Sequence, residues 1–360
     1  MNKIDIAVLG LGKMGATHVG AAKASPHVNK IYGYEPDAER AEERGKELEI
    51  DATSDLESLL NNPDVKFIDI AAPNPMHCEL AIKALRAGKA VLCEKPMAET
   101  LEDAERLVAV AEETGGFLQI GFELRYSKAY MKLKEWIDNG LIGVPVNLHS
   151  RYFCSEFHRK GTWRSDSPGS LIGEKLSHYL DAQRWYMNDE IKNIYSLSAP
   201  NVVKYFNHPD NHQISTRFKN GAVGTLNFVM YISESDQGDP LMDLLDKQSD
   251  DGHFLQLYIM GDKGALEFDV FKRRLRRWQF TDEEDGIKSE IVETIIYDKE
   301  EDTEQMHNVH GQNLRVIELV AKGLPPENPA SDSLISMKVC FAAEISEKEE
   351  RIVDLEEMLS

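Results

Sequence analysis

The first third of the chain alternates between short apolar runs and amphipathic stretches. The apolar runs predict strands at Ile4–Leu9, Asn29–Tyr34, Phe67–Ala71, Ala90–Cys93 and Phe117–Gly121. The amphipathic stretches predict helices at Gly15–Lys23, Ala38–Leu48, Leu56–Leu60, His77–Ala87 and Leu101–Thr114. Because strands and helices alternate, this part is expected to form an α/β fold with a doubly wound parallel sheet.

The hydrophobic pattern changes near Arg125. Two further helices are expected at Tyr130–Ile137 and Glu174–Met187. Strand-like runs dominate from Val144 to about Gln279, at Val146–Tyr152, Ile191–Ser198, His212–Phe218, Gly224–Tyr231, Phe254–Met260 and Ala265–Phe268. Since few helices separate these runs, we expect an α+β domain with one large, mainly antiparallel open sheet, and a return to helix from Gly311.

An Asp-rich stretch, Ser233–Asp251, interrupts the strand pattern. It is expected to be a long acidic loop, with a helical turn at Leu241–Leu245 as the alternative for part of it. Long loops in compact domains are either functional or disordered, and both alternatives remain open here. If it is functional, the loop would act as a lid that closes over the substrate.

The composition, 42% hydrophobic and 29% charged residues, is that of a globular protein. The formal net charge of -21 argues against sequence-independent nucleic-acid binding and against anionic membranes, and favours an uncharged or cationic small substrate. No apolar stretch approaches the roughly 20 residues of a membrane helix, and the first apolar run lacks the basic start of a secretion signal. The cysteines show no zinc-like spacing, so we expect a cytoplasmic protein with free thiols and no metal site.

Three glycines, Gly10, Gly12 and Gly15, follow the first predicted strand and open the first predicted helix. In a dinucleotide-binding turn the first glycine permits the tight bend, the second lets the backbone approach the pyrophosphate, and the third lets helix and strand pack closely. The diphosphate would bind the free N–H groups of the helix N-terminus, in the turn that contains Lys13 and Met14. We therefore interpret residues 1–124 as a Rossmann-type nucleotide-binding domain and residues 125–360 as a second domain.

Glu35 stands at the end of the second predicted strand, about 20 residues beyond Gly15. A carboxylate at this place can accept both ribose hydroxyls and would repel the 2′-phosphate of NADP, so the expected cofactor is NAD, with NADP as the less favoured alternative. Arg40 could hold a phosphate or stack on adenine, but we interpret it as a solvated helix residue.

Lys95 directly follows the strand-like run that ends at Cys93 and Glu94. Ligands of open α/β sheets bind outside the carboxyl ends of the strands, so the glycine turn and Lys95 are expected to face one crevice. A dinucleotide and an amine in one crevice suggest redox chemistry.

Several motifs together resemble the glucose–fructose oxidoreductase, inositol dehydrogenase and rhizopine-catabolism (Gfo/Idh/MocA) family. These motifs are Ala72–His77, Ala84–Lys89, Glu94–Ala98, Gly121–Tyr126 and Met260–Ala265. The resemblance covers essentially the whole chain, and Ser233–Asp251 matches least. It implies an NAD-binding Rossmann domain over residues 1–124, and a substrate-binding domain over residues 125–360 that builds homodimers or homotetramers.

The resemblance implies that Lys95 lies beside the nicotinamide and the reacting hydroxyl, and that Pro96 follows a cis peptide bond. An ammonium there would stabilise a developing alkoxide and could pass a proton. By the same resemblance His178 accepts the hydroxyl proton, which suits the intrinsic pKa of histidine.

The helix segment that contains His178 departs from the family pattern at three positions. Glu174 replaces an aspartate, Lys175 follows it, and Leu176 stands where glycine is common. On a regular α-helix Glu174 and His178 lie about 40° apart on one face, so Glu174 is expected to orient the substrate or His178. Lys175 either binds substrate or pairs with a carboxylate, and both remain open. A metal site at Glu174, His178 and Asp181 is not expected, because hydride transfer needs none.

The resemblance also implies the remaining contacts of the site. The expected cofactor contacts are Asn74, His77, Glu94, Trp163 and Arg164. The expected substrate contacts, besides Lys95, Lys175 and His178, are Arg125 and, as weaker pocket candidates, Tyr152 and His158. His310 could also enter the site, on its position alone.

The function implied is that of an NAD-dependent oxidoreductase, which moves hydride between nicotinamide and a secondary alcohol of a sugar, cyclitol or glycoside. One alternative is an NAD-dependent glycosidase or lyase that acts through transient oxidation. Another is a non-catalytic NAD-binding regulator, although the presence of both Lys95 and His178 counts against it.

Overall fold

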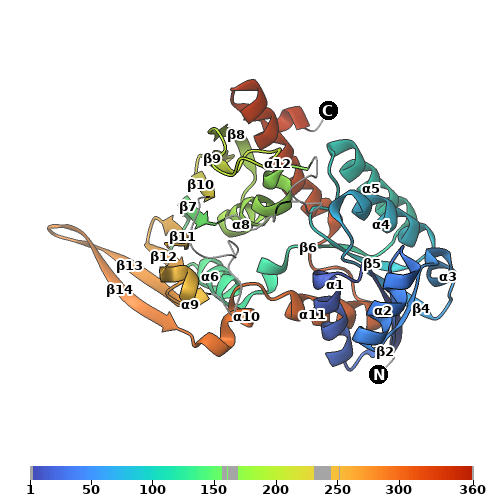
Figure 1. Cartoon of the computed structure of the whole chain (residues 1–360). Helices are drawn as coiled ribbons and strands as arrows, with labels where there is room; N and C mark the ends of the chain where they lie inside the picture. The colour runs from blue at the N-terminus through green and yellow to red at the C-terminus, as the bar shows by residue number, and fades with distance from the viewer. Residues whose placement is uncertain (1–2, 156–159, 161–168, 231–244, 251, 359–360) are drawn as a thin grey trace. The chain divides into compact units, whose positions relative to one another are not determined.

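The computed structural model describes residues 3–155, 160, 169–230, 245–250 and 252–358. The chain forms two compact units (Figure 1). Unit 1 consists of Met1–Tyr126 and Asn308–Met337, and unit 2 consists of Ser127–His307 and Lys338–Ser360. The sequence-based boundary after residue 124 lies close to the first of these divisions, but the sequence pattern had placed residues 308–337 in the second domain.

Unit 1 contains a six-stranded parallel sheet with the strand order β3-β2-β1-β4-β5-β6. The strands are β1 (Ile4–Leu9), β2 (Val28–Tyr34), β3 (Asp51–Thr53), β4 (Val65–Ile70), β5 (Ala90–Glu94) and β6 (Leu118–Gly121). The crossover helices are α1 (Lys13–Ala24), α2 (Ala38–Leu48), α3 (Leu56–Leu60), α4 (His77–Arg86) and α5 (Leu101–Thr114). This order is that of the Rossmann fold, and it confirms the doubly wound parallel sheet.

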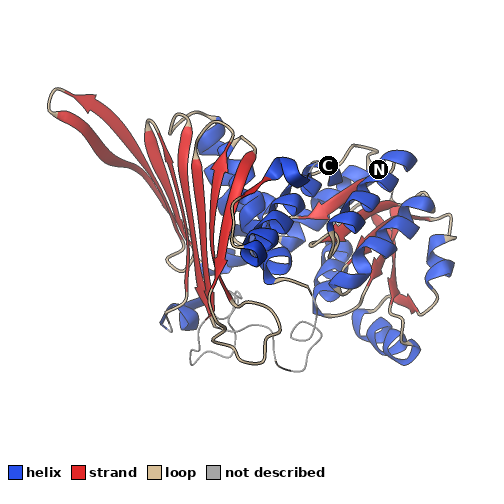
Figure 2. Ribbon diagram, turned by 90° about the horizontal axis from the view of Figure 1, so that it is seen from above, coloured by secondary structure: helices blue, strands red, loops and turns tan. Residues whose placement is uncertain are grey.

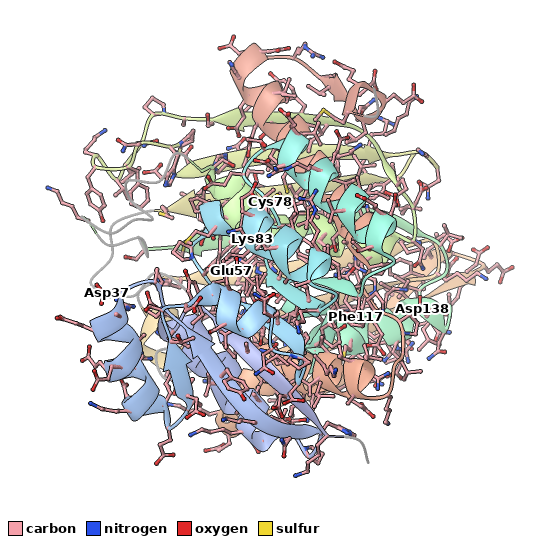
Figure 3. All side chains as sticks on the ribbon, turned by 90° about the vertical axis from the view of Figure 1, so that its right-hand side faces the viewer. Asp37, Glu57, Cys78, Lys83, Phe117 and Asp138 are labelled. Atoms are coloured by element: carbon pink, nitrogen blue, oxygen red, sulfur yellow. The ribbon has the colours of Figure 1, made fainter. Side chains whose placement is uncertain are left out.

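Local capping explains why several helix boundaries could be read from the sequence. The side chain of Asp37, labelled at the start of α2 in Figure 3, accepts a hydrogen bond of 2.8 Å from the N–H of Arg40. The side chain of Thr100 caps α5 in the same way, through the N–H of Asp103 at 3.2 Å. At the other end of α5, Gly115 adopts a φ of 59°, a left-handed conformation that suits glycine.

Helix α11 (Val309–Ala321) belongs to unit 1 because it completes the core on that sheet. The side chains of Val316 and Ile317 are fully buried against the strands, among Ile4, Ile6, Phe67 and Leu92. Fully burying an aliphatic side chain contributes roughly 1.5–3 kcal/mol. This packing is the physical reason that residues far along the chain return to the first unit.

Unit 2 contains a nine-stranded sheet in the order β14-β13-β12-β11-β7-β10-β9-β8-β15. Its strands are β7 (Pro145–Cys154), β8 (Ile191–Ser198), β9 (Asn211–Phe218), β10 (Val223–Met230), β11 (Phe254–Gly261), β12 (Gly264–Asp269), β13 (Arg274–Glu283), β14 (Gly286–Ile296) and β15 (Val353–Asp354). Neighbouring strands are antiparallel except for β7 and β10, which run parallel. The mainly antiparallel sheet is thus confirmed, although β13 and β14 had not been predicted as strands.

The longer helices of unit 2 lie on one face of this sheet (Figure 2). They include α6 (Lys128–Asp138), α8 (Ser177–Met187) and the C-terminal part of α12 (Ala330–Glu349). Buried side chains of β7, such as Leu148 and Tyr152, alternate with exposed ones, such as His149 and Arg151. The hairpin of β13 and β14 extends beyond the other strands of the sheet (Figure 1).

The segment Glu174–Met187 is not the single regular α-helix that the sequence predicted. A π-helical turn spans Ile172–Leu176, and α8 begins only at Ser177. Ser170 initiates the turn: its hydroxyl accepts from the N–H of Gly173 at 3.0 Å, and its carbonyl accepts from the N–H of Glu174 at 2.9 Å. The expected 40° offset between Glu174 and His178 therefore does not hold, because the backbone spacing changes between them.

Candidate active site

The glycine turn after β1 has the packing that a dinucleotide-binding turn requires. Gly10 has a φ of +90°, and a Cβ at this residue would lie 2.7 Å from the Cα of Ala72 after β4. A Cβ on Gly15 would overlap the carbonyl oxygen of Gly10, so α1 can pack against the turn only because residue 15 has no side chain. A Cβ on Gly12 would meet no atom within 4 Å, which leaves open space above that residue.

The start of α1 fits the diphosphate of a dinucleotide. Gly12 is the N-cap residue and supplies no side-chain hydrogen bond to the first turn. Lys13 and Met14, which begin the helix, are exposed. The first N–H groups of a helix have no intrahelical partner and attract anions. The turn and the helix start thus provide donors and space for a phosphate group.

Glu35, which follows β2, is held against the same turn. Its Oε2 accepts a hydrogen bond of 3.2 Å from the N–H of Leu11 and lies 3.4 Å from Nε of Arg40. Arg40 is 53% exposed on α2, which agrees with its interpretation as a solvated helix residue, and it also pairs with this carboxylate. Arg44, which the sequence reasoning did not single out, donates from Nε to the carbonyl of Leu11 at 2.7 Å.

His77 connects the loops that follow β4 and β5. Its Nδ1 lies 2.7 Å from the carbonyl oxygen of Pro96, and its Nε2 lies 2.8 Å from that of Ala72. Burial lowers the pKa of His77, although the two carbonyl oxygens oppose that shift. The ring thus orders the backbone beside Asn74, which is buried in a short 3-10 turn, Asn74–Met76. The Lys95–Pro96 peptide bond is cis, which confirms that expectation.

Glu94 ends β5 and is buried, whereas Lys95, the next residue, is partly exposed. The N–H of Lys95 donates to Oε2 of Glu94 at 3.3 Å. A Cβ on Gly121 of the neighbouring strand would lie 2.8 Å from the Glu94 carboxylate. The carboxylate therefore occupies a slot that exists because residue 121 is glycine.

A second carboxylate and a histidine lie behind Glu94. His18 of α1 is fully buried, and its Nδ1 lies 2.8 Å from Oδ1 of Asp69 in β4. Its Nε2 lies 3.3 Å from Oε1 of Glu94, within ion-pair distance but without the alignment of a hydrogen bond. Burial alone would lower the pKa of His18, but the charge and hydrogen bond of Asp69, together with Glu94, outweigh burial and raise it to about 10.

The sequence reasoning did not find His18 or Asp69, although a signal was present. His18 shares the buried face of α1 with Gly15, Val19 and Ala22, and a polar residue on an apolar helix face needs a partner. Asp69 likewise interrupts a buried apolar strand.

The predicted catalytic and substrate-binding residues on the π turn and α8 of unit 2 are buried. Glu174, Lys175 and His178 are all less than 10% exposed. The Lys175 ammonium lies 5.7 Å from the centre of the Tyr152 ring, in cation–π geometry, and Tyr152 itself packs against Tyr179 and Phe228. The rings of His178 and His307 meet edge to face at 6.2 Å. The sequence did not point to His307 as a site residue. His310, which was a weaker candidate for a substrate contact, belongs to α11 of unit 1.

The remaining predicted residues have other surroundings or lie outside the described part. Arg125 of unit 1 forms an ion pair of 2.9 Å with Asp332. Trp163, Arg164 and His158 lie outside the described residues. Of the acidic stretch Ser233–Asp251, the structure describes only Leu245–Asp250, which form the short helix α9.

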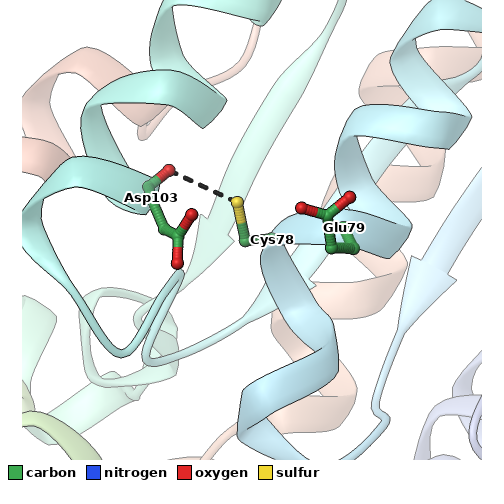
Figure 4. A group of neighbouring side chains, drawn as sticks. All are labelled: Cys78, Glu79 and Asp103. Carbon is green, nitrogen blue, oxygen red and sulfur yellow. Dashed lines mark hydrogen bonds between the residues drawn. The ribbon is translucent and has the colours of Figure 1, made fainter.

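Cys78, Glu79 and Asp103 offer a set of metal-ligand atoms in unit 1 (Figure 4). The thiol of Cys78 donates to the carbonyl of Asp103 at 3.3 Å, and burial raises its pKa. Arg106 already fills the space: it pairs with Glu79, lies 3.0 Å from Oδ1 of Asp103, and approaches the Cys78 sulfur at 3.6 Å. We interpret this group as an ion pair.

The strand order and the glycine turn define a dinucleotide-binding domain of the Rossmann class. The family model described as the oxidoreductase family with an NAD-binding Rossmann fold matches residues 4–122, and the GFO/IDH/MocA C-terminal domain matches residues 130–267. The chain therefore belongs to the GFO/IDH/MocA family of oxidoreductases.

The chain is similar to dehydrogenases among both known sequences and solved structures. An inositol 2-dehydrogenase of Salmonella paratyphi B is 32% identical over 195 residues, which span 53% of this chain and 56% of that relative. A myo-inositol 2-dehydrogenase of Thermotoga maritima is 24% identical over 98% of this chain and 99% of that relative. The structure of a levoglucosan dehydrogenase with NADH and levoglucosan superposes with a TM-score of 0.82, over 98% of this chain and all of that chain. Its sequence identity to this chain is 20%, so the superposition shows a shared fold and nothing more.

Within the part of the chain that the structure describes, no helix combines the length and the apolar character that crossing a membrane would require.

Proposed function

We propose that this protein is an NAD-dependent dehydrogenase that oxidises a secondary alcohol of a cyclitol, sugar or glycoside. One observation carries the proposal: the glycine turn, Glu35 and Lys95 all lie at the carboxyl edge of the unit 1 sheet. Ligands of such sheets bind at this edge, where the strand order reverses between β1 and β4. The names of the related inositol dehydrogenases support the substrate class.

The residues of unit 1 would hold the cofactor and polarise the substrate. The N–H groups at Gly12 and Lys13 would bind the diphosphate, and Glu35 would accept the ribose hydroxyls. Bound NAD would supply the hydride acceptor. The ammonium of Lys95 would stabilise the oxygen of the substrate as negative charge develops on it.

The residues of unit 2 would handle the proton. We propose that His178 accepts the proton of the hydroxyl as hydride leaves the carbinol carbon. The Lys175 ammonium, held over Tyr152, would contribute a positive charge to the surroundings of His178. Glu174 precedes Lys175 in the π turn and would orient the substrate or His178. Single π turns occur frequently at functional sites.

Replacement of Lys95 by alanine tests the proposed reaction. With a panel of inositols, sugars and glycosides, the native protein should reduce NAD, and the Lys95→Ala variant should lose about 100-fold or more in kcat. The variant should still bind NADH, because its glycine turn is intact. Nicotinamide absorbance follows the reaction, and NADH fluorescence follows binding.

Lys83→Ala is the matched control, since Lys83 is exposed on α4 of the same unit (Figure 3), and it should leave kcat unchanged. Glycoside cleavage without net NADH would favour the transient-oxidation enzyme. No reaction with any member of the panel, or full activity in Lys95→Ala, would contradict the proposal.

Glu35 provides a separate test of the proposed NAD preference. Its removal should raise kcat/KM with NADP relative to NAD by about tenfold or more, because the carboxylate no longer repels the 2′-phosphate and Arg40 loses its partner. The measurement is the ratio of kcat/KM for the two cofactors in the native protein and in Glu35→Ala. Arg40→Ala is the control, and it should shift the ratio toward NAD. A native protein that prefers NADP would refute the assignment.

We also propose that the protein forms a homodimer or homotetramer through the outer face of the unit 2 sheet, which is the face opposite α6 and α8. The β13–β14 register contains a bulge, which leaves Ile291 opposite Trp278 and Ile296 opposite Arg274 on the same face. Ile287, Ile291 and Ile296 are 75%, 51% and 71% exposed. Exposed apolar patches of this kind mark protein interfaces, and a second copy of the chain would cover the patch.

Ile291→Lys should weaken this assembly, because burying an unpaired ammonium in an apolar interface is costly. Light scattering coupled to size-exclusion chromatography should show an oligomer for the native protein and a smaller species for the variant. Leu324→Lys, at a 43% exposed apolar residue of unit 1, is the control and should leave the mass unchanged. A monomeric native protein, or an unchanged oligomer in Ile291→Lys, would rule out this interface.

A further inference from the structure

We propose that His18 is a positioning residue for Lys95: its imidazolium fixes the Glu94 carboxylate, which in turn fixes the backbone of Lys95. The inference rests on the proposed function, because it assigns Lys95 a part in the reaction. His18 would touch neither substrate nor cofactor, and would act through Glu94.

The first support is the number of constraints on Glu94. One carboxylate oxygen accepts from the N–H of Lys95 at 3.3 Å, and the other lies 3.3 Å from Nε2 of His18. The space beside the carboxylate is closed by Gly121, where even a Cβ would lie 2.8 Å away. A carboxylate held on three sides fixes the position of the residue that follows it at the end of the strand.

The second support is the charge balance below the carboxyl edge. Asp69 and Glu94 are 0% and 6% exposed, and His18 between them is 0% exposed. A neutral imidazole carries one N–H and no charge, whereas an imidazolium can donate to Asp69 and also place a positive charge 3.3 Å from Glu94. Two buried carboxylates without a cation would be strongly unfavourable. The raised pKa of His18, about 10, agrees with this assignment.

The third support is the position of His18 in α1. It lies three residues beyond Gly15, in the helix whose N-terminus would bind the diphosphate. Its ring contacts β4 and β5, so one side chain joins the cofactor-binding helix to the strand that carries Lys95. A small shift of α1 would therefore be transmitted to Lys95 through Glu94. Misplacement of a reacting group by about 1 Å can cost about 100-fold in rate.

The competing explanation is that the three residues only stabilise the sheet. A double-mutant cycle with His18→Gln and Lys95→Ala separates the two explanations. If His18 acts through Lys95, His18→Gln should lower kcat about 10- to 100-fold in the native background and much less in the Lys95→Ala background. The KM of the polyol and the Kd of NADH should change little.

Equal losses of kcat in both backgrounds, or an unchanged kcat in His18→Gln, would overturn the proposal. Asp69→Asn is the second variant, because it keeps the His18–Glu94 contact while it weakens the support of His18. It should show the same dependence on Lys95 with a smaller loss of kcat. If His18→Gln does not fold, the cycle with Asp69→Asn gives the decision.

A measurement without turnover keeps this inference distinct from the proposed function. The ¹⁵N NMR shifts of the His18 ring in the cofactor-free protein should be those of an imidazolium at pH 8. A neutral ring at pH 8 would overturn the inference whatever the activity. An imidazolium in a protein that reduces no nicotinamide would refute the proposed dehydrogenase while the charge network stands.

Discussion

The counter-charge that His18 provides to Asp69 and Glu94 is the interaction on which the carboxyl edge of the unit 1 sheet depends. The three groups come from α1, β4 and β5, and each is buried. Without the imidazole, the carboxylates of Asp69 and Glu94 would be buried in a medium of low polarity with no positive charge between them. Burying two unpaired charges in this way is costly in free energy. Because the imidazole is present, the helix that begins at the glycine turn is tied to the strand that ends at Lys95. Structural stability and the position of the proposed catalytic amine thus depend on the same contact.

Much of the fold could be predicted because local signals and burial agree. The boundaries of α2 and α5 follow from their caps at Asp37 and Thr100, and β1 follows from a run that is apolar except for Asp5. The hairpin β13–β14 was missed for a physical reason: from Thr281 to Glu290 every side chain is exposed, so no alternation of burial marks the strands. The return of α11 to unit 1 depends on contacts with β1, β4 and β5, which no local pattern contains.

The candidate site could be predicted where a motif carries its own geometry, and less where packing decides. The glycine turn follows from the spacing of Gly10, Gly12 and Gly15, and the cis bond before Pro96 was expected from the family resemblance. The π turn at Glu174 is a change in backbone hydrogen bonding that side-chain periodicity does not reveal. His18 and Asp69 could have been noticed as polar residues on apolar faces, but their pairing needs the three-dimensional structure. The partner of Lys175, the ring of Tyr152, is likewise a tertiary contact.

The central claim is that the carboxyl edge of the unit 1 sheet holds NAD with the nicotinamide beside Lys95. A crystal structure of the protein with NADH tests it most directly. The diphosphate should contact the N–H groups at Gly12 and Lys13, and the ribose should contact Glu35. The nicotinamide C4 should lie near the Lys95 ammonium, so that a carbinol carbon could face C4 while its oxygen contacts the ammonium. NADH bound elsewhere, or bound with its nicotinamide directed away from Lys95, would contradict the account.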